Sequence, residues 1–319
     1  MSFTLRDDQK ALQQGIRDFC AGRFPQDQLQ AIEEWNFDRN LWSELAEMGV
    51  FSLRLDEADG GLGLGMTDAV LVFEELGRAL IPGPIVWTHL AAGLVEGASR
   101  GETIVGGLDL TKGQDEPMLI DDFASLDVVL VLREDGVWKI DASEMSGDAV
   151  SEPLDPLTPV HEITSMPSGE RLGDPSEAKE LSMAGTTLTA ALQLGVAEAT
   201  TDLAVSYAGT REQFKKPIGQ FQAVKHMCAD SFVRQELARG AVYGAAATLE
   251  HPEVGDPVRA ASGAKINAGE AAMRNARTCI QVHGGMGFTW EIPAHFYLKR
   301  AWVLENSFGT QDEHSDLLG

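Results

Sequence analysis

The sequence predicts a mainly α-helical protein with a small β domain in its middle. Apolar residues recur at helical spacing near both ends of the chain, β-prone runs flank an Asp-Gly pair in the middle, and glycine- and proline-rich breaks separate these regions. We therefore expect an N-terminal helical domain over residues 1–100, a β domain over residues 101–175 and a C-terminal helical bundle over residues 176–319.

In the N-terminal domain, Leu12, Ile16 and Phe19 are spaced to share one face of a first helix. The stretch DEADGGLGLG, residues 56–65, contains four glycines and predicts a loop rather than a strand. A second helix is expected over residues 67–80, because the prolines that follow it cannot continue a helix.

The middle and the C-terminal region differ in their periodicity. DVVLVLREDGVWKIDA places a β-prone run on each side of Asp135-Gly136, a dipeptide typical of β-hairpin turns. Beyond it, apolar residues at helical spacing predict long helices near residues 177–210, 222–249 and 257–283.

Composition limits the classes of partner. The 319 residues include 25 Lys and Arg against 49 Asp and Glu, a formal charge of -24, which argues against nucleic acid and anionic membranes as partners. No stretch reaches the roughly 18 apolar residues of a membrane span, and the N-terminus has no apolar signal segment, so we expect a cytoplasmic protein. Three cysteines without a CxxC pair predict neither a disulfide framework nor a zinc site, and no metal ligands are predicted.

A first polar cluster occupies YAGTREQFKKPIGQFQAVKH, residues 207–226. Arg211, Lys215 and Lys216 place three cations within six residues of a very acidic chain, beside aromatic residues. Arginine recognises phosphate through a planar pair of donors, so an anion site is one interpretation. A solvated helix end explains the same charges, and both interpretations stay open.

Two further clusters follow near the C-terminus. In QVHGGMGF, residues 281–288, a helix-ending glycine explains one glycine but not all three, which suggests main chain close to a ligand. The motif lacks the preceding strand of a dinucleotide-binding fingerprint, and a plain helix end remains the alternative. The third cluster, LENSFGTQD at residues 304–312, combines another helix-ending glycine with small polar groups.

Together, in this order and spacing, the three clusters resemble the C-terminal domain of the acyl-CoA dehydrogenase family. The family's YAxxRxQFGxPIxxFQ segment matches Tyr207–Gln222, with Lys215 in place of the motif's glycine; its QxxGGxGF segment matches Gln281–Phe288, and its GT pair matches Gly309-Thr310. LWSELAEMGVFSL and VFEELGRALIPGP resemble the family's first domain. The resemblance implies a helical domain, a β domain, a four-helix bundle, bound FAD and α,β-dehydrogenation of an acyl-CoA thioester.

The resemblance also implies which residues bind the cofactor. In the family, residues of these motifs reach across a dimer interface to hold the phosphates and adenosine of FAD. The matching positions here are Arg211, Gln213, Phe214, Gln222, Gln281, Val282, His283, Gly284, Gly285, Thr310 and Gln311. An acyl-CoA substrate and an electron-transfer flavoprotein or a similar electron acceptor are the partners expected with that chemistry.

The positions of the family's catalytic base carry no base in this chain. Most members place a glutamate directly before the GT pair, where this chain has Phe308, and others use a position in an earlier helix that corresponds to Gly185. Neither side chain can accept a proton. The nearest carboxylates, Glu180 and Glu305, are out of register, so no catalytic residue is predicted and Glu305 is the one weak candidate.

The middle region lacks the family's TEPxxGSD-like loop and its W-I-T/S segment, which hold the flavin ring, and it is shortened. This pattern resembles the small non-catalytic subunits of heteromeric acyl-CoA dehydrogenases in actinobacterial steroid side-chain degradation. It implies a full-length dehydrogenase partner, in an α2β2 complex, that supplies base and flavin clasp. Two other interpretations stay open: a self-sufficient homodimeric dehydrogenase with Glu305 as its base, and a non-enzymatic acyl-CoA-binding or scaffold protein.

Overall fold

The structure is a computed structural model that describes residues 5–25, 29, 37–113 and 117–319. It divides into two compact units. The first unit combines Met1–Ala31, Val70–Ile81 and Thr187–Gly319, and the second combines Ile32–Ala69 and Pro82–Thr186.

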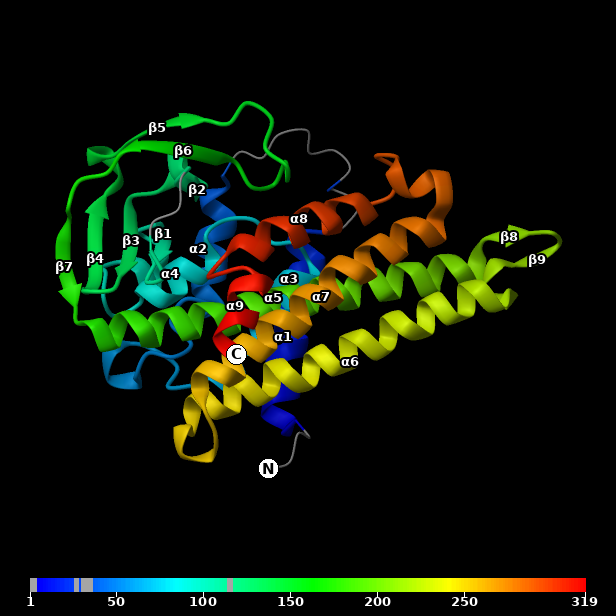
Figure 1. The fold of residues 1–319 in the computed structure, drawn as a ribbon, viewed down its shortest axis with the longest axis horizontal. Helices are drawn as coiled ribbons and strands as arrows, with labels where there is room; N and C mark the ends of the chain where they lie inside the picture. The colour runs from blue at the N-terminus through cyan, green and yellow to red at the C-terminus, as the bar shows by residue number, and fades with distance from the viewer. Residues whose placement is uncertain (1–4, 26–28, 30–36, 114–116) are drawn as a thin grey trace. The chain divides into compact units, whose positions relative to one another are not determined.

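The first unit is helical (Figure 1). Its helices are α1 (Asp7–Arg23), most of α3 (Met66–Arg78), most of α5 (Pro175–Thr210), α6 (Gln222–Glu250), α7 (Pro257–His283), α8 (Ala294–Asn306) and α9 (Gln311–Leu318). Helices α5, α6 and α7 begin and end within two residues of the ranges predicted from periodicity, and α3 occupies the range predicted for the second N-terminal helix. Helices α3 and α5 contribute residues to both units, so these units are not the three consecutive domains expected from the sequence. The predicted domain boundaries at residues 100 and 175 therefore stay a prediction.

A buried asparagine joins the three long helices of the bundle. The Asn275 side chain on α7 donates to the carbonyl oxygen of Ser231 on α6 (3.0 Å) and to the hydroxyl of Thr201 on α5 (3.2 Å), and it accepts from Arg234 on α6 (2.8 Å). A buried amide that is fully hydrogen-bonded fixes the register of the helices around it. The predicted mainly helical fold with a C-terminal bundle is thereby confirmed.

The second unit contains α2 (Arg39–Glu47), the 3-10 turns η2 (Glu57–Asp59) and η3 (Ala98–Arg100), α4 (Ile85–Ala91) and two small sheets. One sheet has the order β1-β3-β4-β7, where β1 is parallel to β3 and the other pairs are antiparallel. The other has the order β2-β6-β5 and is antiparallel. The strands are β1 (Val105–Leu110), β2 (Leu119–Asp121), β3 (Val128–Arg133), β4 (Gly136–Asp141), β5 (Ser146–Ala149), β6 (Val160–Ser165) and β7 (Glu170–Gly173).

The predicted hairpin is present, but its turn lies one residue earlier than expected. Arg133 pairs with Gly136, so the loop consists of residues 134–135 and the glycine begins β4. Gly136 has a φ of 144°, and a Cβ there would stand 2.3 Å from the Gly173 carbonyl oxygen. The close approach of β7, rather than the turn, therefore requires glycine at this position.

The predicted loop over residues 56–65 is confirmed, with η2 as a short turn inside it. Of the helices that the structure describes, none is both long and apolar enough to cross a membrane.

Candidate cofactor site

A short hairpin follows the end of α5 and carries the first polar cluster. It consists of β8 (Glu212–Gln213) and β9 (Lys216–Pro217), which are antiparallel, and it projects from one end of the helical unit (Figure 1). The Ile218 N–H donates to the Arg211 carbonyl oxygen (2.8 Å) and closes the base of the hairpin. Its two-residue tip is therefore formed by Phe214 and Lys215.

The hairpin presents cations and an aromatic ring to solvent. Arg211 is exposed, and Phe214 is 86% exposed. Residues 211–226 hold four Lys or Arg against one Glu, in a chain whose formal charge is -24. At its end, α6 begins without a side-chain cap on its N-terminal N–H groups, and such a helix end favours anions. The local electrostatics therefore suit an anionic ligand.

The second cluster is a glycine turn at the end of α7. The helix ends at His283, and the 3-10 turn η8 (Gly284–Phe288) follows. Gly284 has a φ of 61°, and a Cβ on Gly287 would stand 2.5 Å from the Ile280 carbonyl oxygen, so chain geometry requires both glycines. A Cβ on Gly285 would meet no atom within 4 Å. Helix termination thus explains two of the three glycines, and Gly285 leaves an exposed main chain that a ligand can approach.

An aromatic stack brings the two clusters together. The Tyr207 ring near the end of α5 stacks on the His283 ring at the end of α7, with a centroid distance of 4.2 Å. His283 and Val282 are buried, and the His283 Nδ1–H donates to the Cys279 carbonyl oxygen (2.7 Å), so neither side chain is available to a ligand. Gln281 is exposed. The hairpin, its following Gln222 and the glycine turn thus share one end of the bundle.

The third cluster lies elsewhere on the same unit. The main-chain N–H and side-chain amide of Gln311 donate to the Glu305 carboxylate (2.7 and 3.1 Å), close to Gly269 in the middle of α7. Gly269 and Gln281 are 12 residues apart on α7, so the third cluster lies about 18 Å along the helix from the start of the glycine-turn cluster. The Thr310 hydroxyl and N–H are engaged with Glu313 in a capping box at the start of α9. The structure therefore does not bring Thr310 and Gln311 to the hairpin, and their polar groups are used within the chain.

The positions expected for a base contain none. Phe308 is buried between α8 and α9, and Gly185 is buried on α5. The Glu305 carboxylate accepts two hydrogen bonds from Gln311 and so caps the first turn of α9. Glu305 therefore has the role of a helix cap in this structure, and both of its oxygens are occupied by that role.

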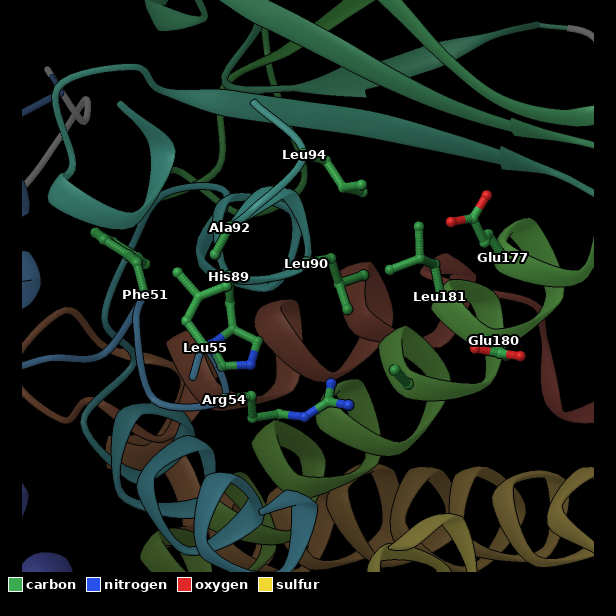
Figure 2. A pocket seen from close by; sticks show the side chains of 11 residues that line it. Phe51, Arg54, Leu55, His89, Leu90, Ala92, Leu94, Glu177, Glu180 and Leu181 are labelled. Carbon is green, nitrogen blue, oxygen red and sulfur yellow. The ribbon is translucent and has the colours of Figure 1, made fainter. Parts of the chain in front are cut away.

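The second unit holds a cavity of about 280 Å³ that the sequence did not indicate (Figure 2). Apolar side chains of α4, α5 and the segment after α2 form most of its wall, with four polar side chains among them. The lining residues are Phe51, Arg54, Leu55, His89, Leu90, Ala92, Leu94, Glu177, Glu180, Leu181 and Ala184. No local sequence motif marks this cavity, because its walls come from segments far apart in the chain.

Within the cavity wall, His89 is neutral at physiological pH. Its Nδ1–H donates to the Val50 carbonyl oxygen (2.8 Å), and burial lowers the pKa of its imidazole to about 4. Glu177 and Glu180 stand on α5 at another side of the cavity (Figure 2). Glu180 lies five residues before Gly185 on α5, out of register with the expected position of the base. Its side chain nevertheless lines the cavity.

Two family models match the chain. "Acyl-CoA dehydrogenase, N-terminal domain" matches residues 6–99, and "Acyl-CoA dehydrogenase, C-terminal domain" matches residues 179–319.

Curated relatives and solved structures are similar over most of the chain. Acyl-CoA dehydrogenase IpdE2 of Mycobacterium tuberculosis is 34% identical, over 83% of this chain and 81% of IpdE2. Acyl-CoA dehydrogenase FadE34 of the same organism is 35% identical over 94% of this chain, but the chain spans only 46% of the length of FadE34.

Two solved structures of two-component assemblies share the fold at 25% identity. The "Tcur3481-Tcur3483 steroid ACAD G363A variant" has a TM-score of 0.85, with 99% of this chain and 98% of that chain covered. The ChsE4-ChsE5 complex from Mycobacterium tuberculosis has a TM-score of 0.82, with 100% of this chain and 98% of that chain covered.

Proposed function

Because this chain belongs to the acyl-CoA dehydrogenase family, we propose that it is the FAD-completing subunit of a heteromeric acyl-CoA dehydrogenase. The complex would introduce an α,β double bond into an acyl-CoA thioester. One combination of features carries the proposal: an exposed surface suited to a dinucleotide, formed by the hairpin and the glycine turn, in a chain with Phe308 and Gly185 where a base is needed.

The residues at this end of the bundle fit the phosphate and adenosine parts of FAD, the cofactor of the family. The exposed Arg211 guanidinium can donate two parallel hydrogen bonds to a diphosphate. The open main chain at Gly284 and Gly285 leaves room for the ligand to approach, and the exposed Phe214 ring offers an apolar face to adenine. When bound, the flavin supplies the hydride acceptor of the reaction.

The proton-accepting group must come from a partner under this proposal. Abstraction of the α-proton needs a base within hydrogen-bond reach of that proton. Phe308 has no titratable group, and both oxygens of Glu305 are engaged with Gln311. A full-length dehydrogenase subunit in an α2β2 complex would supply the carboxylate and hold the flavin ring.

The similar proteins support a second chain as partner. The two solved structures of assemblies each carry two component names, and more than half of FadE34 lies outside the region similar to this chain. The words "steroid ACAD" describe the Tcur3481-Tcur3483 protein. By analogy we infer a bulky, ring-containing acyl-CoA as substrate, with electron-transfer flavoprotein or a similar protein as electron acceptor.

One observation favours a second candidate, a self-sufficient homodimeric dehydrogenase. The cavity of about 280 Å³ has Glu177 and Glu180 in its wall, and a carboxylate beside an apolar cavity is suited to general-base catalysis. Glu305 is the other carboxylate weighed for this role, although it caps α9. In this candidate either Glu180→Gln or Glu305→Gln would abolish turnover of the isolated chain, whereas both variants would leave the base of a heteromeric complex untouched.

Co-expression tests the leading proposal. We expect the chain alone to be colourless and inactive, and the chain with its partner to hold stoichiometric flavin. A charge-assisted hydrogen bond contributes about 1.5 to 3 kcal/mol, so Arg211→Ala should weaken FAD binding by the complex roughly 10- to 150-fold. Arg211→Lys is the control that keeps the charge, and it should restore part of the FAD affinity that Arg211→Ala loses. Stoichiometric flavin and acyl-CoA turnover by the isolated chain would contradict the proposal.

A further inference from the structure

The tip of the β8–β9 hairpin has a backbone that its residue types disfavour. Phe214 and Lys215 have φ angles of 52° and 67°, both in the left-handed region. Two-residue hairpin loops need positive φ at these positions, and glycine or asparagine normally supplies it. A Cβ at positive φ is sterically costly, and both tip residues carry one.

The two adjacent lysines have different surroundings. The Lys216 ammonium lies over the Phe221 ring, 4.3 Å from its centroid, which is a cation–π contact. Lys215 is exposed, and among the described residues no hydrogen bond or ion pair holds its ammonium. The other charged groups on the hairpin are Arg211 at its base and Glu212 on β8. Lys215 is therefore a cation without a partner in the described chain, carried by the tip of the hairpin.

We propose that Lys215 is a further cofactor-binding residue, whose ammonium contacts the diphosphate of the dinucleotide that Arg211 also binds. This inference rests on the proposed function. Two cations on one hairpin match the two negative charges of a diphosphate, and the paired strands β8 and β9 already form the turn that carries Lys215. An ammonium is a point charge that tolerates several phosphate orientations, so it complements the planar guanidinium.

The experiment measures the FAD dissociation constant of the co-expressed complex at low ionic strength. Lys215→Gln removes the charge and keeps the turn, Lys215→Gly removes both charge and steric strain, and Lys215→Arg keeps the charge. We expect the dissociation constant to rise about five- to tenfold for the first two and to stay within about twofold for Lys215→Arg. Lys179→Gln, an exposed lysine on α5, is the control for loss of one positive charge and should match wild type.

A second measurement tests whether Lys215 binds the cofactor or instead an acidic surface of the partner subunit. Assembly of the two subunits without FAD should have the same dissociation constant for wild type and Lys215→Gln. Weakened assembly without FAD would overturn the inference, because Lys215 would then serve the partner's surface, and so would unchanged FAD binding by Lys215→Gln.

Arg211→Ala distinguishes the failure of this inference from failure of the proposed function. If Arg211→Ala loses FAD and Lys215→Gln does not, only the role of Lys215 is wrong. If both variants bind FAD as wild type does, the hairpin does not contribute to a cofactor site at all.

Discussion

Phe308 occupies a position where the backbone is constrained and the side chain is packed. It is 5% exposed with a φ of 56°, which for a bulky residue costs about 1 to 2 kcal/mol. The His314 Nε2–H donates to its carbonyl oxygen (2.9 Å), and the His314 Nδ1 accepts from the Ser262 hydroxyl (3.0 Å). These bonds fix the tautomer and hold the main chain in place. The phenyl ring therefore fills space in the core of the turn.

Phe308→Leu should leave the turnover of the assembled complex within about twofold of wild type, because the ring has no role in proton transfer. An apolar replacement of similar size in a core costs less than about 1.5 kcal/mol. The measurements are kcat at saturating acyl-CoA and the urea midpoint of unfolding. Phe308→Ala is the control for packing and should cost about 3 to 5 kcal/mol. A large fall in kcat for Phe308→Leu, with flavin content unchanged, would show that the ring acts in the reaction.

At the scale of elements, a buried lysine holds the turn between α8 and α9. Lys265 on α7 is fully buried, and its ammonium lies 2.7 to 3.0 Å from four main-chain carbonyl oxygens of this turn. The four carbonyls belong to Leu304, Glu305, Ser307 and Gly309. The last carbonyls of a helix lack partners within it, so a cation there satisfies them and opposes the negative end of the helix dipole.

Lys265→Met should destabilise the first unit by about 3 kcal/mol or more, because several buried carbonyls lose their donor at about 1 to 3 kcal/mol each. Hydrogen exchange of the amides of residues 304–313 should increase more than that of α6. Ethylammonium should partly restore protection in Lys265→Ala, since it refills the space with a cation. Lys179→Met on the surface of α5 is the control and should cost less than about 0.5 kcal/mol. Protection that ethylammonium does not change would mean that the lysine matters only as volume.

The sequence predicted elements well where the signal is local. Helical periodicity over tens of residues gave α5, α6 and α7 to within two residues, and the Asp-Gly signal located the β3–β4 hairpin. The turn was displaced by one residue because Gly136 is required by the approach of β7, a contact between distant segments. Distant contacts also explain why the cavity and the role of Lys265 were not predicted. A lysine in an alanine-rich helix has no local feature that distinguishes a buried position from an exposed one.

The candidate site was predictable to a similar degree. The motifs identified the two segments, residues 207–226 and 281–288, that the Tyr207–His283 stack joins at one end of the bundle, but they did not predict that the first one forms a hairpin. They did not reveal that the polar groups of Thr310 and Gln311 are engaged with Glu313 and Glu305, since that depends on the packing of α9.

At the scale of the whole molecule, this acidic chain buries a few of its carboxylates. Glu74, Glu75 and Glu198 of the first unit are each 6% exposed or less. Their partners are Arg17 on α1, Arg78 on α3, and Arg239 and Tyr243 on α6. Burial raises the pKa of Glu74 to about 7, although the Tyr243 hydroxyl donates to it (2.7 Å) and Arg239 lies near. The first unit therefore binds a proton that the unfolded chain releases at lower pH.

Glu74→Gln should remove a pH-dependent loss of stability. The pKa of Glu74 is about 7 in the folded chain against 4.5 in the unfolded chain, so the contribution of Glu74 to stability falls as pH rises from about 4.5 to about 7 and does not change further above that range. A glutamine keeps an oxygen that accepts from the Tyr243 hydroxyl, and because it does not ionise, the variant does not lose stability as the pH rises. We expect the variant to match wild type near pH 4.5 and to exceed its free energy of unfolding by about 1 to 3 kcal/mol at pH 8. Urea unfolding of the isolated chain at both pH values measures this, with the exposed Glu212→Gln as control. A difference between variant and wild type that is the same at both pH values would mean that Glu74 is ionised throughout and that its arginine neighbours outweigh its burial.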